Sequence, residues 1–195
     1  MHHRVTEVNP VEKSAGFSFY PSNSVSLNRQ CRYHQHSYYS LPMKTAGSII
    51  SNALVFIYAI GSGVWVNTGD NWYRTLNAPS WQPPDFVFGI IWPYNFIVFA
   101  VAAVIVANRS SDSTSIIFLS IMALSIALSL TWAYQFYRPH NLGIATIALA
   151  LCAALTIPLL VITARTSIPA AIALIPYQFW LITAAALSYS YARGN

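Results

Sequence analysis

Residues 142–164 read LGIATIALALCAALTIPLLVITA, without a single charged side chain. The run exceeds the roughly 20 residues that a helix needs to cross a bilayer. Four runs of similar length lie at 46–66, 86–107, 116–137 and 168–192, and none contains Asp, Glu, Lys or Arg. One small soluble core cannot enclose five such helices. The sequence therefore predicts an all-α membrane protein, a bundle of five transmembrane helices within residues 43–195.

The composition of the 195-residue chain agrees with this fold class. Hydrophobic residues make up 55% of the chain and charged residues only 8%, against about a quarter charged in soluble domains. A soluble globular domain and a wholly disordered chain are both excluded. The net charge is +5, but half of the basic residues lie in the first 44 positions, so no basic face for nucleic acid is expected. Cys31 and Cys152 lie far apart in different surroundings, so we expect neither a metal site nor a cofactor.

Residues 1–42 differ from the rest of the chain. They are rich in Ser and His and contain no apolar stretch typical of a signal peptide. We expect this segment to be a disordered extension, dispensable for membrane insertion, since Met43 and Lys44 directly before an apolar run resemble a natural start. A targeting role is the alternative.

The link between the first two runs, residues 67–85, is longer than the other links. It reads NTGDNWYRTLNAPSWQPPD, and its Gly, Asn and Pro residues argue against one long helix. Its aromatic residues predict that it packs either on the mouth of the helix bundle or on the membrane surface. It is either a lid on the mouth of the bundle or an interfacial anchor, and composition favours the anchor.

This link and the following run resemble the TspO/MBR family, the tryptophan-rich sensory proteins and translocator proteins. The family pattern W-Y-x-x-L-x-x-P-S-W-x-P-P, followed by G-x-x-W, stands here at Trp72–Tyr73, Leu76, Pro79–Trp81, Pro83–Pro84, Gly89 and Trp92. Further matches are Trp132, Phe136 and Tyr137 in the third run and Pro176, Tyr177, Trp180, Ala184 and Leu187 in the last. The resemblance covers about residues 46–195. The chain departs from the family pattern at Ala78, Phe96, Ser129 and Ser188.

The resemblance implies a multi-pass membrane protein of a bacterial plasma membrane or a mitochondrial outer membrane. It also implies a hydrophobic ligand, a tetrapyrrole such as a porphyrin or a sterol-like molecule, bound for sensing, transport or tetrapyrrole homeostasis. A homodimer is the third implication. Small residues at Ala123/Ala127 and Ser125/Ser129 in the third run are compatible with a close helix contact.

Helical spacing places aromatic side chains on common faces. Each of three runs has a stripe, a set of residues three or four positions apart that share one helix face. The stripes are Phe88, Trp92, Phe96 and Phe99 in run 86–107; Ser129, Trp132 and Phe136 in run 116–137; and Tyr177, Trp180, Ala184 and Leu187 in run 168–192. They are compatible with one cavity for a flat apolar ligand or with plain helix packing. The ligand-binding residues expected from the resemblance are Tyr73, Pro83, Trp92, Trp132, Trp180, Ala184 and Leu187, and spacing adds Phe88, Phe96 and Ser129.

Asn95 and three prolines interrupt the apolar runs. We interpret Asn95 as an amide that pairs with carbonyls freed by the nearby Pro93. Pro158 and Pro176 are expected to bend their helices and open space inside the bundle.

Two other functions stay open. The resemblance includes porphyrin breakdown, in which Trp92 and Trp180 would be photo-oxidised, although the runs contain no conventional acid, base or nucleophile. Turnover of protoporphyrin, compared with a Trp92→Phe variant, distinguishes this enzyme from a binding protein. A scaffold without a ligand is the other alternative, and it predicts no saturable quenching of tryptophan fluorescence.

Overall fold

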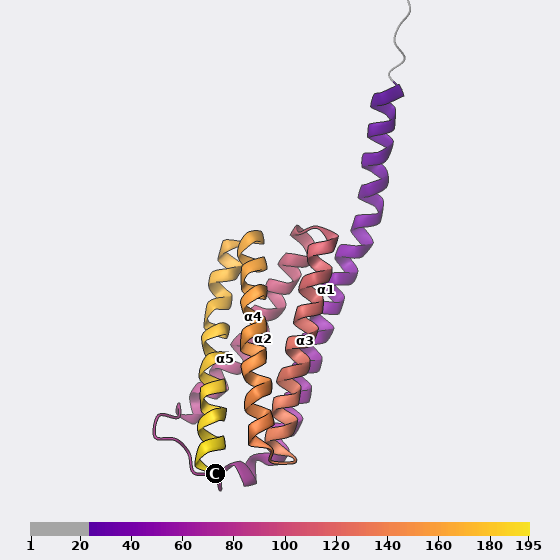
Figure 1. Ribbon diagram of the computed structural model, residues 1–195. Coiled ribbons are helices and arrows are strands. Elements are labelled where there is room, and N and C mark those ends of the chain that lie inside the picture. The colour runs from indigo at the N-terminus through magenta and orange to yellow at the C-terminus, as the bar shows by residue number, and fades with distance from the viewer. Residues whose placement is uncertain (1–23) are drawn as a thin grey trace, which may run out of the picture. The chain divides into compact units, whose positions relative to one another are not determined.

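The computed structural model describes residues 24–195, with side chains from Lys44 onward except that of Asp70. Over this range the chain is helical and contains no strand. Five helices follow one another: α1 (Ser24–Tyr73), α2 (Asp85–Arg109), α3 (Asp112–Tyr137), α4 (Leu142–Thr166) and α5 (Ile168–Gly194) (Figure 1). The predicted all-α membrane fold is confirmed, and α2 to α5 end within a few residues of the predicted runs.

The first helix differs from the prediction at both ends. It begins at Ser24 rather than near residue 46, and it continues to Tyr73 rather than ending at residue 66. The link to α2 is therefore residues 74–84, since Asn67 to Tyr73 continue the helix despite their polar composition. We predicted disorder for residues 1–42. Residues 24–42 belong to α1 instead, and residues 1–23 lie outside the described part of the chain.

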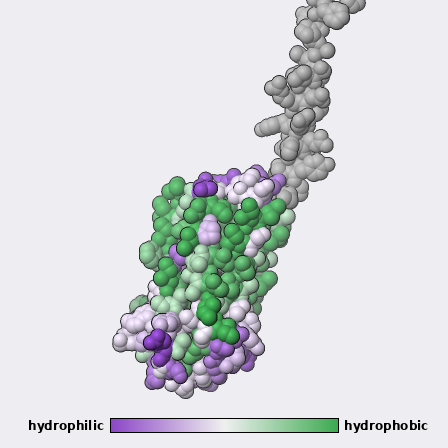
Figure 2. All heavy atoms as spheres, in the orientation of Figure 1, coloured by the Kyte–Doolittle hydropathy of each residue, from purple (hydrophilic) through white to green (hydrophobic). Residues whose placement is uncertain are grey.

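All five helices are long and apolar enough to cross a membrane, with Lys44–Gly69 as the span of α1. Large apolar side chains cover the outside; Phe56, Phe86 and Phe179 are each about two-thirds exposed or more, at 70%, 68% and 66%. Apolar residues cover the middle of the face in Figure 2, and polar residues gather at its two ends. This distribution is the one that a hydrocarbon surrounding requires.

Side chains cap the N-termini of α3 and α4. The Ser111 hydroxyl accepts from the Thr114 amide at 3.3 Å, and the Asn141 side-chain oxygen accepts from the Ile144 amide at 3.2 Å. Arg109 and Arg165 lie in last turns, where a cation complements the helix dipole. These polar residues mark where each membrane span stops.

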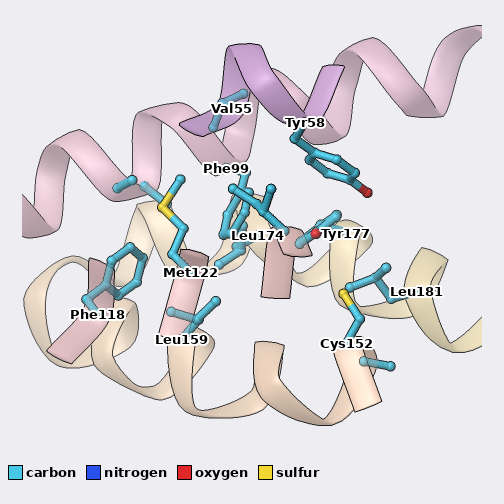
Figure 3. Packing of buried hydrophobic residues seen from close by; sticks show 14 of the residues in the cluster. Val55, Tyr58, Phe99, Phe118, Met122, Cys152, Leu159, Leu174, Tyr177 and Leu181 are labelled. Carbon is cyan, nitrogen blue, oxygen red and sulfur yellow. The ribbon is translucent and has the colours of Figure 1, made fainter. Parts of the chain in front are cut away.

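Residues 38–195 form one unit. Within it α4 packs between α3 and α5, while α2 contacts α3, α4 and α5. Helix α1 packs on α2 and α3: the Tyr58 ring meets the Phe96 ring edge-on at 5.0 Å, and the absence of a side chain at Gly69 leaves room for the Tyr137 ring. The core cluster in Figure 3 joins Phe99, Leu174 and Tyr177 to residues of α1, α3 and α4.

Pro93, Pro158 and Pro176 lie inside α2, α4 and α5, and neighbouring side chains bond to backbone carbonyls near two of these prolines. The Gln178 side-chain nitrogen donates to the Ala153 carbonyl at 3.0 Å, one turn before Pro158. The Tyr94 hydroxyl donates to the Ala173 carbonyl at 2.8 Å, close to Pro176. Such bonds satisfy polar backbone groups where water is absent.

Candidate functional site

A cavity of about 730 Å³ opens inside the bundle toward the end that carries the α1–α2 link. Helices α1, α2, α3 and α5 supply most of its wall, and Leu149 comes from α4. A volume of this size lies within the range of small-molecule sites, roughly 300–1,000 Å³.

Aromatic rings form the walls of this cavity. The Trp92 ring of α2 and the Trp132 ring of α3 are stacked, with 6.1 Å between centroids and 28° between planes. Across the cavity wall, Phe88 of α2 meets Trp180 of α5 edge-on at 5.2 Å. Ala184, one turn after Trp180, leaves room beside these rings. The site therefore offers flat apolar surfaces from three helices.

The inner end of the cavity lies near the middle of the membrane. Asn95 is the deepest polar residue that α2 contributes, and Tyr58 and Leu181 lie with it among the lining residues. One turn further along α2, the Phe99 ring is almost fully buried and packs on the Tyr177 ring at 5.1 Å. The Phe99–Tyr177 pair therefore closes the floor.

The α1–α2 link covers the opposite end. Tyr191 of α5 bonds to the side-chain oxygen of Gln82 and lies 3.2 Å from the Tyr73 hydroxyl, oxygen to oxygen. The Asn77 amide donates to the side-chain oxygen of Asn195 at 2.8 Å, which ties the link to the end of α5. Residues 74–84 are thus held as a lid by α5.

The lid brings charge to the mouth. Arg74 and Asp85 line the cavity there, and Gln82 adds an amide. The rest of the described lining is mainly apolar or aromatic. The site is therefore polar at its outer end and, apart from a few hydroxyls and Asn95, apolar inside.

The profile of the TspO/MBR family matches residues 52–193. The chain belongs to the TspO/MBR family. The tryptophan-rich protein TspO of Bacillus cereus is 29% identical over 144 residues, which cover 72% of this chain and 94% of that protein. The human translocator protein is 28% identical over 138 residues, 70% of this chain and 82% of its own. Protein CrtK of Rhodobacter capsulatus is 26% identical over 125 residues, 64% of this chain and 78% of its own.

Most of the ligand-binding residues expected from the TspO/MBR resemblance and from spacing meet in this cavity. Its lining includes Tyr73, Phe88, Trp92, Phe96, Trp132, Trp180, Ala184 and Leu187. Their role in binding stays a prediction, because geometry alone places them together without a ligand.

Two of the expected residues lie elsewhere. Ser129 is buried against α4, where its hydroxyl lies 3.0 Å from the Cys152 sulfur, and it does not line the cavity. Pro83 is half-buried in the lid and also lies outside the lining. Phe99, the last member of the α2 stripe, belongs to the core below the floor.

The structure also corrects two interpretations. Trp72 and Tyr73 form the end of α1 and pack on Phe136 of α3, with ring centroids at 5.7 and 6.2 Å, so they contact the bundle rather than serving as an interfacial anchor. Trp81 is 47% exposed, as an interfacial residue would be. No hydrogen bond from the Asn95 side-chain nitrogen to a carbonyl near Pro93 occurs among the described residues, and the Asn95 side-chain oxygen is unpaired as well, so Asn95 does not stabilise that kink.

The α1 wall of the site was missed from the sequence. Tyr58, Ser62 and Val66 follow each other at intervals of four residues and all line the cavity. This helical spacing was the available signal.

Proposed function

We propose that this TspO/MBR protein binds a flat hydrophobic small molecule, of the porphyrin or sterol-like class, in the cavity beneath the α1–α2 link. The observation that carries the proposal is the lining of the 730 Å³ cavity by aromatic rings from α1, α2, α3 and α5. Aromatic partners add roughly 0.5–1.5 kcal/mol per ring pair beyond the burial of area. A flat ring system gains the most binding free energy from such walls, because its faces can contact several aromatic rings at once.

The lid supports binding of a molecule that enters and leaves. Its hydrogen bonds to α5 join Tyr191 with Gln82 and Asn77 with Asn195, and Leu76 adds an apolar contact with the cluster that contains Leu187 and Tyr191. The walls, in contrast, are held by packing between long helices. The printed names of relatives, tryptophan-rich sensory protein and translocator protein, agree with a role in sensing or transport of such a ligand.

A homodimer through α3 is the second part of the proposal. Ala127 is exposed on the outer face of this helix, and Ala123 is half-buried beside it. Ser125 and Ser129 instead face Cys152 inside the protein. Only the alanine pair is therefore available for close approach by a second copy.

Cavity filling tests the ligand site. Ala184→Phe adds a ring inside the cavity, and Ala186→Phe adds the same ring to an exposed position of the same helix. With protoporphyrin IX and with cholesterol as probes, we expect saturable binding to the parent protein and to Ala186→Phe. Ala184→Phe should bind about tenfold or more weakly, since overpacking costs roughly 1–3 kcal/mol. Equal binding by both variants would contradict a site in this cavity.

A further inference from the structure

The floor of the cavity contains a polar group with no partner. The Asn95 side chain is only 4% exposed, yet its side-chain oxygen has no hydrogen bond among the described residues. The Trp132 indole nitrogen, also buried, is without a partner in the same part of the chain. Both residues line the cavity. Two residues that line the same cavity therefore carry unpaired groups: the Asn95 side-chain oxygen, an acceptor, and the Trp132 indole N–H, a donor.

The depth of Asn95 makes its unpaired side-chain oxygen costly. Asn95 lies ten positions after Asp85, the first residue of α2, which corresponds to about 15 Å along a helix at 1.5 Å per residue. This is near the middle of a hydrocarbon layer about 30 Å thick. Unpaired amide and indole groups are unfavourable there because neither lipid nor packed side chains replace the lost bonds.

A structural role does not account for Asn95. The side-chain nitrogen of Asn95 donates to no carbonyl near Pro93 among the described residues, its oxygen has no donor, and the neighbouring Phe96 and Phe99 are apolar. A leucine at this position would pack in the wall without any unpaired group. Several other buried polar side chains do have partners: Ser125 and Ser129 lie beside Cys152, and Gln178 bonds to Ala153. The third unpaired group among the described residues is the hydroxyl of Tyr177, below the floor of the same cavity.

We propose that Asn95, at the inner end of the cavity, and Trp132, on its wall, select a ligand whose inner end bears a group that both donates and accepts a hydrogen bond. The ligand is an otherwise apolar ring system with a secondary amide, lactam or hydroxyl, and this end enters first. The N–H or O–H of that group donates to the Asn95 oxygen, and its oxygen accepts from the Trp132 indole N–H. This inference rests on the proposed function, because it names the chemistry of a molecule bound in the same cavity.

Three flat probes of nearly equal size test the selection. Phenanthridin-6(5H)-one has an N–H and a carbonyl, its N-methyl derivative has only the carbonyl, and phenanthrene has neither. Equilibrium dialysis against the full chain in lipid nanodiscs, with empty nanodiscs to subtract partition into lipid, gives the three dissociation constants. The variants are Asn95→Leu, which removes the amide, and Asn52→Leu, which removes an exposed amide of α1 outside the cavity.

We expect the parent protein and Asn52→Leu to bind the lactam about tenfold more tightly than its N-methyl derivative, the scale of one buried hydrogen bond. Asn95→Leu should lose this preference and bind phenanthrene at least as well as the parent protein does. Its unaltered or higher thermal stability would show that the loss is not unfolding.

Equal affinity of the parent protein for all three probes would overturn the selection while leaving the cavity as a binding site. A preference that persists in Asn95→Leu would overturn the role of Asn95. Failure of every probe to bind the parent protein would instead contradict the proposed function itself, and the inference with it.

Discussion

The Trp92 ring of α2 and the Trp132 ring of α3 lie stacked at 6.1 Å, centroid to centroid, on the wall of the cavity. The Tyr58 ring of α1 lies 6.4 Å from Trp92. Three helices therefore meet at Trp92. A substitution there changes the wall of the site and the contact between helices at once, so tests of the site need a matched control for stability.

The lid should control the rate of exchange. Tyr191→Phe removes the hydroxyl that bonds to Gln82 and lies beside that of Tyr73. Loss of about 1 kcal/mol from one hydrogen bond predicts roughly fivefold faster dissociation of protoporphyrin IX in stopped-flow measurements. Tyr189→Phe, at an exposed hydroxyl that accepts from Arg193, should leave the rate unchanged. Equal rates for both variants would show that the link is not a lid.

Close packing of α1 on α3 should be sensitive to one methyl group. A Cβ at Gly69 would lie 2.5 Å from Cδ1 and 2.7 Å from Cβ of Tyr137, so the tyrosine or the helix must move. Gly69→Ala is expected to lower the free energy of unfolding in detergent by about 1–3 kcal/mol. Gly89→Ala meets no atom within 4 Å and should be neutral or slightly stabilising. A neutral Gly69→Ala would contradict this packing.

The membrane spans were predictable because charged residues stop them. Asp85, Arg109, Asp112 and Arg165 stand at or next to helix ends, as the apolar runs indicate. The end of α1 was not predictable from the sequence, because its last turns are polar and contain Gly and Asn. Packing of Trp72 and Tyr73 on Phe136 accompanies the helical continuation there, and such tertiary contacts are invisible in local composition.

The site was predictable where an aromatic stripe and a family motif coincide. Spacing cannot tell which side of a stripe faces a cavity, so Ser129 was placed in the site although it faces Cys152. A single tyrosine in an apolar run, such as Tyr58, is not distinguishable from a lipid-facing residue by spacing alone. Asn95 was recognised as buried, but its lack of a partner is visible only in three dimensions.

Dimer formation is expected to depend on Ala127. Replacing this exposed alanine by leucine holds two helices apart, so Ala127→Leu should lower the dimer fraction in detergent, measured by analytical ultracentrifugation. Ala150→Leu, at an exposed alanine of α4, should leave the fraction as it is. If neither substitution changes the dimer fraction, α3 is not the interface.

The central claim is that Trp92 and Trp180 face a shared ligand cavity. Trp65 is the control, because it packs on Tyr134 and does not line the cavity. The decisive measurement is titration of protoporphyrin IX, followed by the porphyrin's own absorption, into the parent protein and the three single alanine variants. We expect Trp92→Ala and Trp180→Ala to weaken binding by about 1–3 kcal/mol, and Trp65→Ala by less than about 0.5 kcal/mol. Equal losses in all three, or no loss in Trp92→Ala and Trp180→Ala, would contradict the account.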